Sequence, residues 1–331
     1  MSLERQLEAA RLSDRATAAP GPARYLAAVL GGGIAGLLAI GLFYGGLHMA
    51  GKLPPPPLSN NYCVDEKLVF LRNNPPTDPN FAVIGSSVAW RSIDSSIIAQ
   101  EMPGARPLNA GFCGMQVHQS AFIANWITER WPSIQQMVLI ISPLDYESCE
   151  GSGQVFDPTD ANKLVFERKP TWSFYLRYFD PVSLLRNVER KAADAAHARA
   201  MGVMREYTEY GDGPLDTSLD RGLFYGPVAN LDKSCLDALR SLATQLAEQG
   251  RQLMVVTMPV HPEWIARYDP DGSVRRWITN GVTTALDGTG ADLWNAMEAR
   301  PLDGSAFTDA IHIRWSAAHT LTEEIVRRLR H

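Results

Sequence analysis

Short apolar runs alternate with amphipathic stretches along most of the chain after residue 80. We expect five buried strands, at Phe81–Ile84, Arg106–Asn109, Met137–Ser142, Leu253–Pro259 and Ala291–Trp294. The intervening segments have the periodicity of helices, most clearly Ile93–Met102, Val117–Glu129 and Leu231–Gln249. Because strand and helix alternate regularly, the pattern predicts an α/β fold with a doubly wound, parallel five-stranded sheet.

The N-terminal region has a different pattern. Residues 25–51 contain no Asp, Glu, Lys or Arg, and such a helix is long enough to cross a bilayer core of ~30 Å. Arginines lie before this segment and only Lys52 soon after it, which favours a cytoplasmic tail at residues 1–24 and an exported C-terminal part. A cleaved signal peptide is the alternative, but its apolar core would normally be only about 7–15 residues long.

Two further segments fall outside the strand and helix alternation. Residues 52–75 contain four consecutive prolines near their start, Pro54–Pro57, and we expect a stiff linker before an exported domain at residues 76–331. Residues 150–230 form an insertion between the third and fourth strands, far longer than the usual connection of about 2–6 residues. Its aromatic centre, Trp172–Phe179, is expected to pack a small core of its own, to cover a site, or to meet the membrane or a partner.

Candidate chemistry appears where the first strand ends. Gly85-Ser86-Ser87 follows this strand directly, so the Ser87 hydroxyl is expected at the carboxyl edge of the sheet, where open α/β folds bind ligands. A serine nucleophile needs a base and a group that orients the base. Asp309 and His312 lie three residues apart before the last helix, and we expect them to complete a catalytic triad with Ser87.

These motifs resemble those of the SGNH (GDSL-like) hydrolases. Gly85-Ser86-Ser87 is similar to their first block, with Ser86 in place of the usual aspartate, and Asp309-x-x-His312 is similar to their last. The resemblance implies a flavodoxin-like strand order. It also implies an oxyanion hole formed by the N–H groups of Ser87 and of a glycine in Leu108-Asn-Ala-Gly-Phe-Cys-Gly114. Gly114 is the better positional match, and Gly111 is the alternative.

The third block departs from the family pattern. The family usually has Gly-x-Asn-Asp there, whereas this chain has Ser142-Pro-Leu-Asp145, so Leu144 replaces the asparagine of the oxyanion hole. With Met258-Pro-Val-His-Pro-Glu-Trp264 and the Trp315 that follows His312, this departure resembles the membrane-anchored SGNH proteins of acyl-transfer systems. These include the DltD-like proteins and the accessory proteins of polysaccharide O-acetylation.

The resemblance implies an acyltransferase that moves an acyl group, with acetyl as the expected one, to an envelope or exported polysaccharide. A multi-pass membrane O-acyltransferase would deliver the donor. An esterase that removes acyl groups and a noncatalytic glycan-binding scaffold are the alternatives. His118, His261 and Trp315 are possible substrate contacts, although capping or packing is the commoner role of such histidines. The net charge of −5 argues against nucleic-acid binding.

The four cysteines all follow the apolar segment, which agrees with disulfide bonds in an oxidising compartment. Cys113 and Cys149 are expected in neighbouring loops at one sheet edge, so we predict that they are bonded to each other. Cys63 would then pair with Cys235. A metal site is the other possibility, but no two cysteines have ligand spacing, and we expect neither a metal nor a cofactor.

Overall fold

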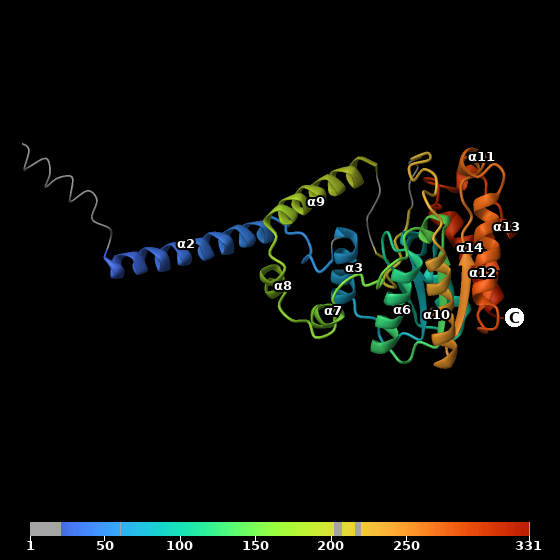
Figure 1. The fold of residues 1–331 in the computed structure, drawn as a ribbon, viewed down its shortest axis with the longest axis horizontal. Helices are drawn as coiled ribbons and strands as arrows, with labels where there is room; N and C mark the ends of the chain where they lie inside the picture. Colours follow the sequence, from blue (N-terminus) through green and yellow to red (C-terminus); the bar gives the residue numbers. More distant parts are fainter. Residues whose placement is uncertain (1–20, 60, 202–206, 216–219, 331) are drawn as a thin grey trace, which may run out of the picture. The chain divides into compact units, whose positions relative to one another are not determined.

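A computed structural model of the chain describes residues 21–59, 61–201, 207–215 and 220–330. The chain divides into two compact units, one ending at Leu53 and the other beginning at Pro54 (Figure 1). In the first unit, helix α2 spans Pro22–Met49 and has no buried residues. It is long and apolar enough to cross a membrane. The predicted apolar helix is therefore present, while most of the expected tail at residues 1–24 lies outside the described residues.

The second unit contains one five-stranded parallel sheet, as predicted. Its strands are β1 (Phe81–Gly85), β2 (Pro107–Gly111), β3 (Gln136–Ile141), β4 (Gln252–Thr257) and β5 (Asp292–Asn295). They are arranged in the order β2-β1-β3-β4-β5, which is the flavodoxin-like order. From β1 the chain goes first to β2 on one side and then to β3 on the other, so the strand order reverses between β1 and β3. Ligands in such folds bind at the carboxyl ends of the strands at this point.

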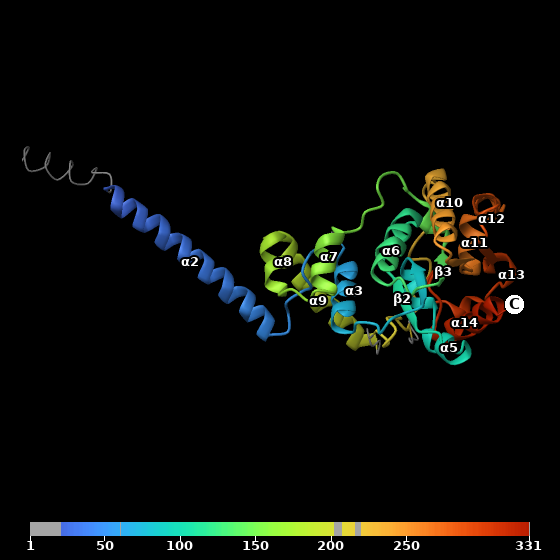
Figure 2. The same cartoon turned by 90° about the horizontal axis from the view of Figure 1, so that it is seen from below.

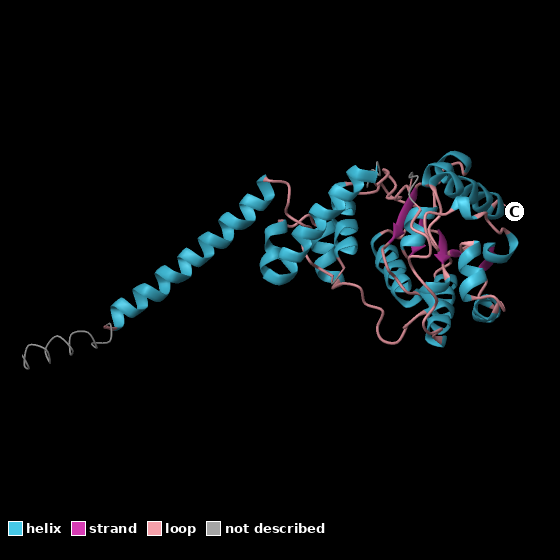
Figure 3. Cartoon of the chain, turned by 90° about the horizontal axis from the view of Figure 1, so that it is seen from above, coloured by secondary structure: helices cyan, strands magenta, loops and turns pink. Residues whose placement is uncertain are grey.

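Helices cover both faces of this sheet (Figures 2 and 3). Alternate residues of β1 enter two different cores: Ala82 and Ile84 join one, and Phe81 and Val83 join the other. The first core is closed by α6 (Val117–Arg130), α10 (Lys233–Glu248) and α12 (Ser273–Leu286). The second is closed by α4 (Ser87–Ser92), α5 (Ser95–Glu101) and α14 (Trp315–Leu329). The sheet is thus doubly wound.

The segment expected to be a linker belongs to the folded unit. Pro54 and Leu58 are buried, and helix α3 (Tyr62–Asn73) packs Val64, Leu68 and Leu71 into the first core. These three apolar positions recur at helical spacing behind the N-cap Asn61, whose side chain accepts a hydrogen bond from the Cys63 N–H. The folded unit therefore begins about twenty residues earlier than the predicted boundary at residue 76.

In its described residues the predicted insertion contains three helices, α7 (Pro158–Val165), α8 (Thr171–Arg177) and α9 (Pro181–Met201). They lie together beside α3 in both views of the fold (Figures 1 and 2). The remaining short elements are η1 (Pro143–Tyr146), α11 (Pro262–Tyr268), α13 (Ala296–Ala299) and η2 (Gly304–Ala306).

The predicted disulfide pairing is wrong. The structure bonds Cys63 to Cys113, with Cα atoms 6.0 Å apart, and Cys149 to Cys235, with Cα atoms 5.0 Å apart. The physical reason is the position of α3. Because this helix packs against the loop after β2, it brings Cys63 to Cys113, and α10 brings the buried Cys235 to the chain that follows β3.

Candidate active site

The turn between β1 and α4 places Ser87 at the carboxyl edge of the sheet. Gly85 ends the strand with a φ of 138°, and a Cβ there would lie 2.3 Å from the Ile140 carbonyl oxygen. Only glycine fits this position. Ser86 caps α4 by accepting a hydrogen bond from the Val88 N–H at 3.3 Å. Ser87 is therefore the first residue of α4, and its side chain remains partly exposed.

The structure brings Ser87, His312 and Asp309 together as predicted. His312 Nε2 lies 2.9 Å from Ser87 Oγ, and His312 Nδ1 lies 3.0 Å from each carboxylate oxygen of Asp309. Asp309 Oδ1 also accepts the backbone N–H groups of Ile311 and His312. Asp309 and His312 are buried, so the carboxylate fixes the tautomer that leaves Nε2 as the acceptor for the serine proton.

Burial and hydrogen bonding set the charges of this triad. Burial lowers the pKa of His312 and outweighs the opposing effect of Asp309. Burial alone would raise the pKa of Asp309, but the hydrogen bonds from His312 and from the backbone N–H groups leave that pKa below its ordinary value. The resting site thus has a neutral imidazole and a carboxylate, which are the protonation states that a general base and its orienting group require.

Asp145 anchors the serine-bearing turn. The Ser86 hydroxyl donates to Asp145 Oδ2 at 3.0 Å, and the Ser142 N–H donates to the same oxygen at 2.7 Å. These bonds join the carboxyl ends of the neighbouring strands β1 and β3. Burial raises the pKa of Asp145 to about 7, and the hydrogen bonds from Ser142 and Ser86 partly oppose the shift.

The second predicted oxyanion donor lies in the turn after β2. The Gly111 N–H donates to Asn109 Oδ1 at 2.9 Å, so it is already engaged. Gly114 has a φ of 66° in the following turn and remains the candidate. The Cys63–Cys113 disulfide holds this turn to α3, and Asn61 Nδ2 donates to the Cys113 carbonyl oxygen at 3.3 Å.

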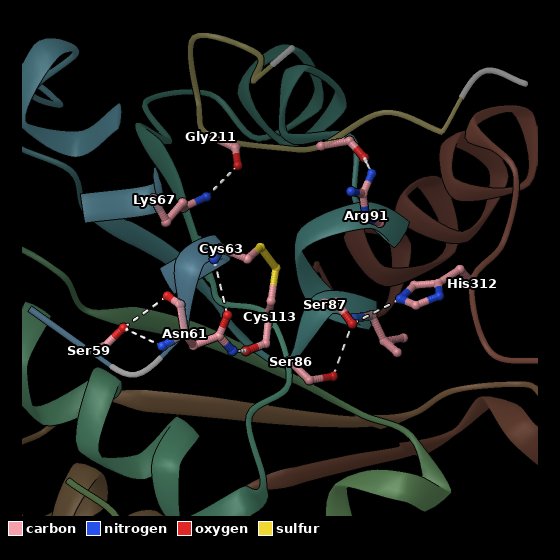
Figure 4. Close-up of a disulfide and its surroundings, with 12 residues drawn as sticks. Ser59, Asn61, Cys63, Lys67, Ser86, Ser87, Arg91, Cys113, Gly211 and His312 are labelled. Atoms are coloured by element: carbon pink, nitrogen blue, oxygen red, sulfur yellow. Dashed lines mark hydrogen bonds between the residues drawn. A yellow bond between two sulfur atoms is a disulfide. The ribbon is translucent and has the colours of Figure 1, made fainter. Parts of the chain in front are cut away.

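Figure 4 shows the Cys63–Cys113 disulfide and Asn61 beside the turn that carries Ser86 and Ser87, with His312 directed at Ser87. Neither Asn61 nor the Cys63–Cys113 bond was predicted to belong to the site. A polar N-cap before an apolar helical repeat was the signal that could have placed α3 here.

Two insertion residues also contact the triad. The Arg221 N–H donates to the Thr308 carbonyl oxygen at 2.7 Å, and Arg221 Nη1 lies 3.4 Å from Asp309 Oδ2. The Tyr225 ring lies 5.3 Å from the His312 ring, centroid to centroid. The end of the insertion therefore packs on the triad, a contact that the sequence analysis considered only in general terms.

Leu144 occupies the position after β3 where the resemblance described above led us to expect an asparagine. Leu144, in η1, is partly buried and packs against the second core, as do Leu223 and Tyr225. An aliphatic side chain has no hydrogen-bond donor to offer an oxyanion. The position after β3 is therefore apolar and offers no hydrogen bond to an oxyanion.

The three other predicted contacts have different positions. His118 is on α6 and lies beside Gly153 and near Asp232. The Asp232 carboxylate accepts the N–H of Cys149, which is bonded to Cys235. The His261 side chain caps α11 by accepting the Glu263 N–H. The backbone N–H of His261 donates to the Ala310 carbonyl oxygen at 2.9 Å, so this residue supports the loop between Asp309 and His312.

Trp315 begins α14 and packs against the second core.

Within the described residues, no group of three or more His, Cys, Asp or Glu side chains is arranged to hold a metal ion. No known protein-family model matches the chain, and no curated protein matches its sequence.

Proposed function

We propose that this protein is a membrane-anchored SGNH-type serine acyltransferase that acylates an exported polysaccharide. The observation that carries the proposal is the chain of hydrogen bonds that links Ser87 Oγ, the His312 imidazole and the Asp309 carboxylate. Such an arrangement activates a serine for attack on an acyl group. Ser87 also lies at the carboxyl end of β1, beside the point where the strand order reverses. Such folds bind ligands there, which supports the proposal that Ser87 reacts with a substrate.

In the first half of the reaction, Ser87 Oγ attacks the carbonyl carbon of the acyl donor while His312 Nε2 takes the hydroxyl proton. The N–H groups of Ser87 and Gly114 stabilise the tetrahedral oxyanion. The intermediate collapses to an acyl-serine, and His312 returns the proton to the leaving donor.

In the second half, His312 takes a proton from a sugar hydroxyl, and the resulting oxygen attacks the acyl-serine. As this second intermediate collapses, the bond between Ser87 Oγ and the acyl carbon breaks, His312 returns the proton to Ser87 Oγ, and the acylated sugar leaves. Because Leu144 supplies no third oxyanion donor, each tetrahedral intermediate is stabilised less than in an SGNH hydrolase with the asparagine. Transfer then depends on a bound sugar hydroxyl that is held next to the acyl-serine and reacts before water does. Acetyl is the proposed acyl group.

The proposed location is the outer side of the cytoplasmic membrane, with α2 retained as a single span. Two observations support it: α2 has the length and composition of a span, and all four cysteines are bonded. A multi-pass O-acyltransferase in the same membrane would supply the acyl donor.

The decisive experiment replaces Ser87 with Ala in the full-length protein in its native cell and measures acyl groups on the exported polysaccharide. The matched control is Ser241→Ala, which removes an exposed hydroxyl on α10. A transferase predicts that acylation is lost only in Ser87→Ala. Increased acylation would instead identify an esterase, and unchanged acylation would identify a noncatalytic role and overturn the proposal.

A further inference from the structure

Exposed apolar side chains gather in one part of the folded unit. Among the described residues outside α2, six large apolar residues are exposed, and five of them lie between residues 172 and 185. They are Trp172 (63% exposed), Leu176 (55%), Phe179 (47%), Val182 (71%) and Leu185 (53%). We call them the α8–α9 apolar surface. Such a concentration is unusual, because exposed apolar residues on soluble proteins are normally scattered.

These five residues recur every three or four positions across α8 and the start of α9. Phe174, Tyr175 and Leu184 in the same segment are buried. The segment therefore already packs one side against the folded unit and presents a second apolar side outward. Its own small core, which the sequence analysis considered, accounts only for the buried residues.

Chain connectivity ties this surface to the end of α2. The Tyr175 hydroxyl donates to the Pro54 carbonyl oxygen, and Pro54 is buried. The N–H groups of Lys52 and Leu53 both donate to the Leu47 carbonyl oxygen, so the chain turns back at the helix end. Only one peptide link, about 3.8 Å between Cα atoms, then separates Leu53 from Pro54. If α2 crosses the membrane, α8 lies close to the membrane surface.

The charges around the α8–α9 apolar surface fit a lipid interface. Residues 167–191 contain six basic and three acidic side chains, although the whole chain has a net charge of −5. Helices with basic residues on a polar face and Trp, Phe or Leu on the opposite face bind at the boundary between headgroups and acyl chains. They bind most strongly to membranes that contain anionic lipids.

We propose that the α8–α9 apolar surface inserts into the headgroup boundary of the membrane that α2 crosses. This contact would be a second membrane attachment and would fix how the Ser87 site faces the bilayer. The inference depends on retention of α2 as an anchor and is independent of the chemistry at Ser87.

The test uses the full chain in nanodiscs of three parts POPC to one part POPG, with and without lipids brominated near the headgroup. Bromine quenches tryptophan fluorescence only at close range. All eight tryptophans lie in the folded unit, and Trp172 is the one with a largely exposed side chain. We expect brominated lipid to quench the wild type, and Trp172→Phe to lose most of that quenching.

Trp277→Phe is the matched control, because Trp277 lies on α12, at the opposite end of the folded unit from α8 (Figures 1 and 2). It should keep the wild-type quenching. A variant with Leu176, Phe179 and Leu185 all changed to Glu should lose the Trp172 quenching while its far-UV circular dichroism stays unchanged. If Trp172→Phe is quenched as strongly as the wild type, Trp172 does not face lipid, and a protein partner would be the better occupant of the surface.

Discussion

Removal of the Cys149–Cys235 disulfide should destabilise the folded unit strongly. The bond closes a loop with a sequence separation of 86 residues. The chain-entropy relation then gives a stabilisation of about 4.6 kcal/mol at 25 °C. Because domains are typically stable by about 5–15 kcal/mol, this is a large share. At about 2–4 °C per kcal/mol for a domain of this size class, the melting temperature should fall by roughly 9–18 °C.

The assay is thermal unfolding of the full chain in detergent, followed by near-UV circular dichroism, for wild type and for Cys149→Ser/Cys235→Ser. Thiol titration of the unfolded protein provides the control. This variant should contain no free thiol, because its other two cysteines are bonded to each other. Cys113→Ser/Cys149→Ser should instead expose two thiols, since Cys63 and Cys235 would both lose their partners. No free thiol in that second variant, or a loss of stability below about 1 kcal/mol in the first, would refute the reasoning.

Three further predictions concern the active site. Asp309→Asn should slow fluorophosphonate labelling by about 10³–10⁴-fold, because the amide stabilises the wrong imidazole tautomer; a labelling rate near that of wild type would contradict this role. The labelling rate should reach half its maximum below pH 6.5, since burial lowers the pKa of His312, and a midpoint above that value would contradict the charge assignment. Asp145→Asn should become more stable relative to wild type as pH rises from about 4 to 7. Folded Asp145 has a pKa of about 7, whereas the unfolded group has its ordinary value of 3.8, so the wild type loses up to about 4 kcal/mol across this window. Urea unfolding at several pH values measures the difference, and a pH-independent difference would contradict it.

The sheet was predictable because its strands are nearly uniform apolar runs. Residues 81–84 and 137–141 are buried on both faces, and such runs bounded by turn residues allow few other structures. The triad was predictable for a related reason. Ser87 follows a strand and His312 precedes a helix, so local pattern alone fixes their positions at the same sheet edge.

Contacts made by α3 and by the insertion could not be predicted in the same way. The disulfide prediction compared loops at the sheet edge and treated Cys63 as part of a linker, whereas α3 places it against Cys113. Arg221 and Tyr225 reach the triad from a segment with no strand or helix periodicity of its own. Their positions depend on tertiary packing, which single-sequence patterns do not encode.

The most direct test of an activated Ser87 is intact-mass analysis of the full chain after exposure to a fluorophosphonate. Wild type is compared with Ser87→Ala, His312→Ala and the surface control Ser241→Ala. We predict one adduct on wild type and on Ser241→Ala, located on the peptide that contains Ser87, and no adduct on the other two variants. An adduct that persists in Ser87→Ala, or no adduct on wild type, would contradict the assignment of Ser87 as the nucleophile.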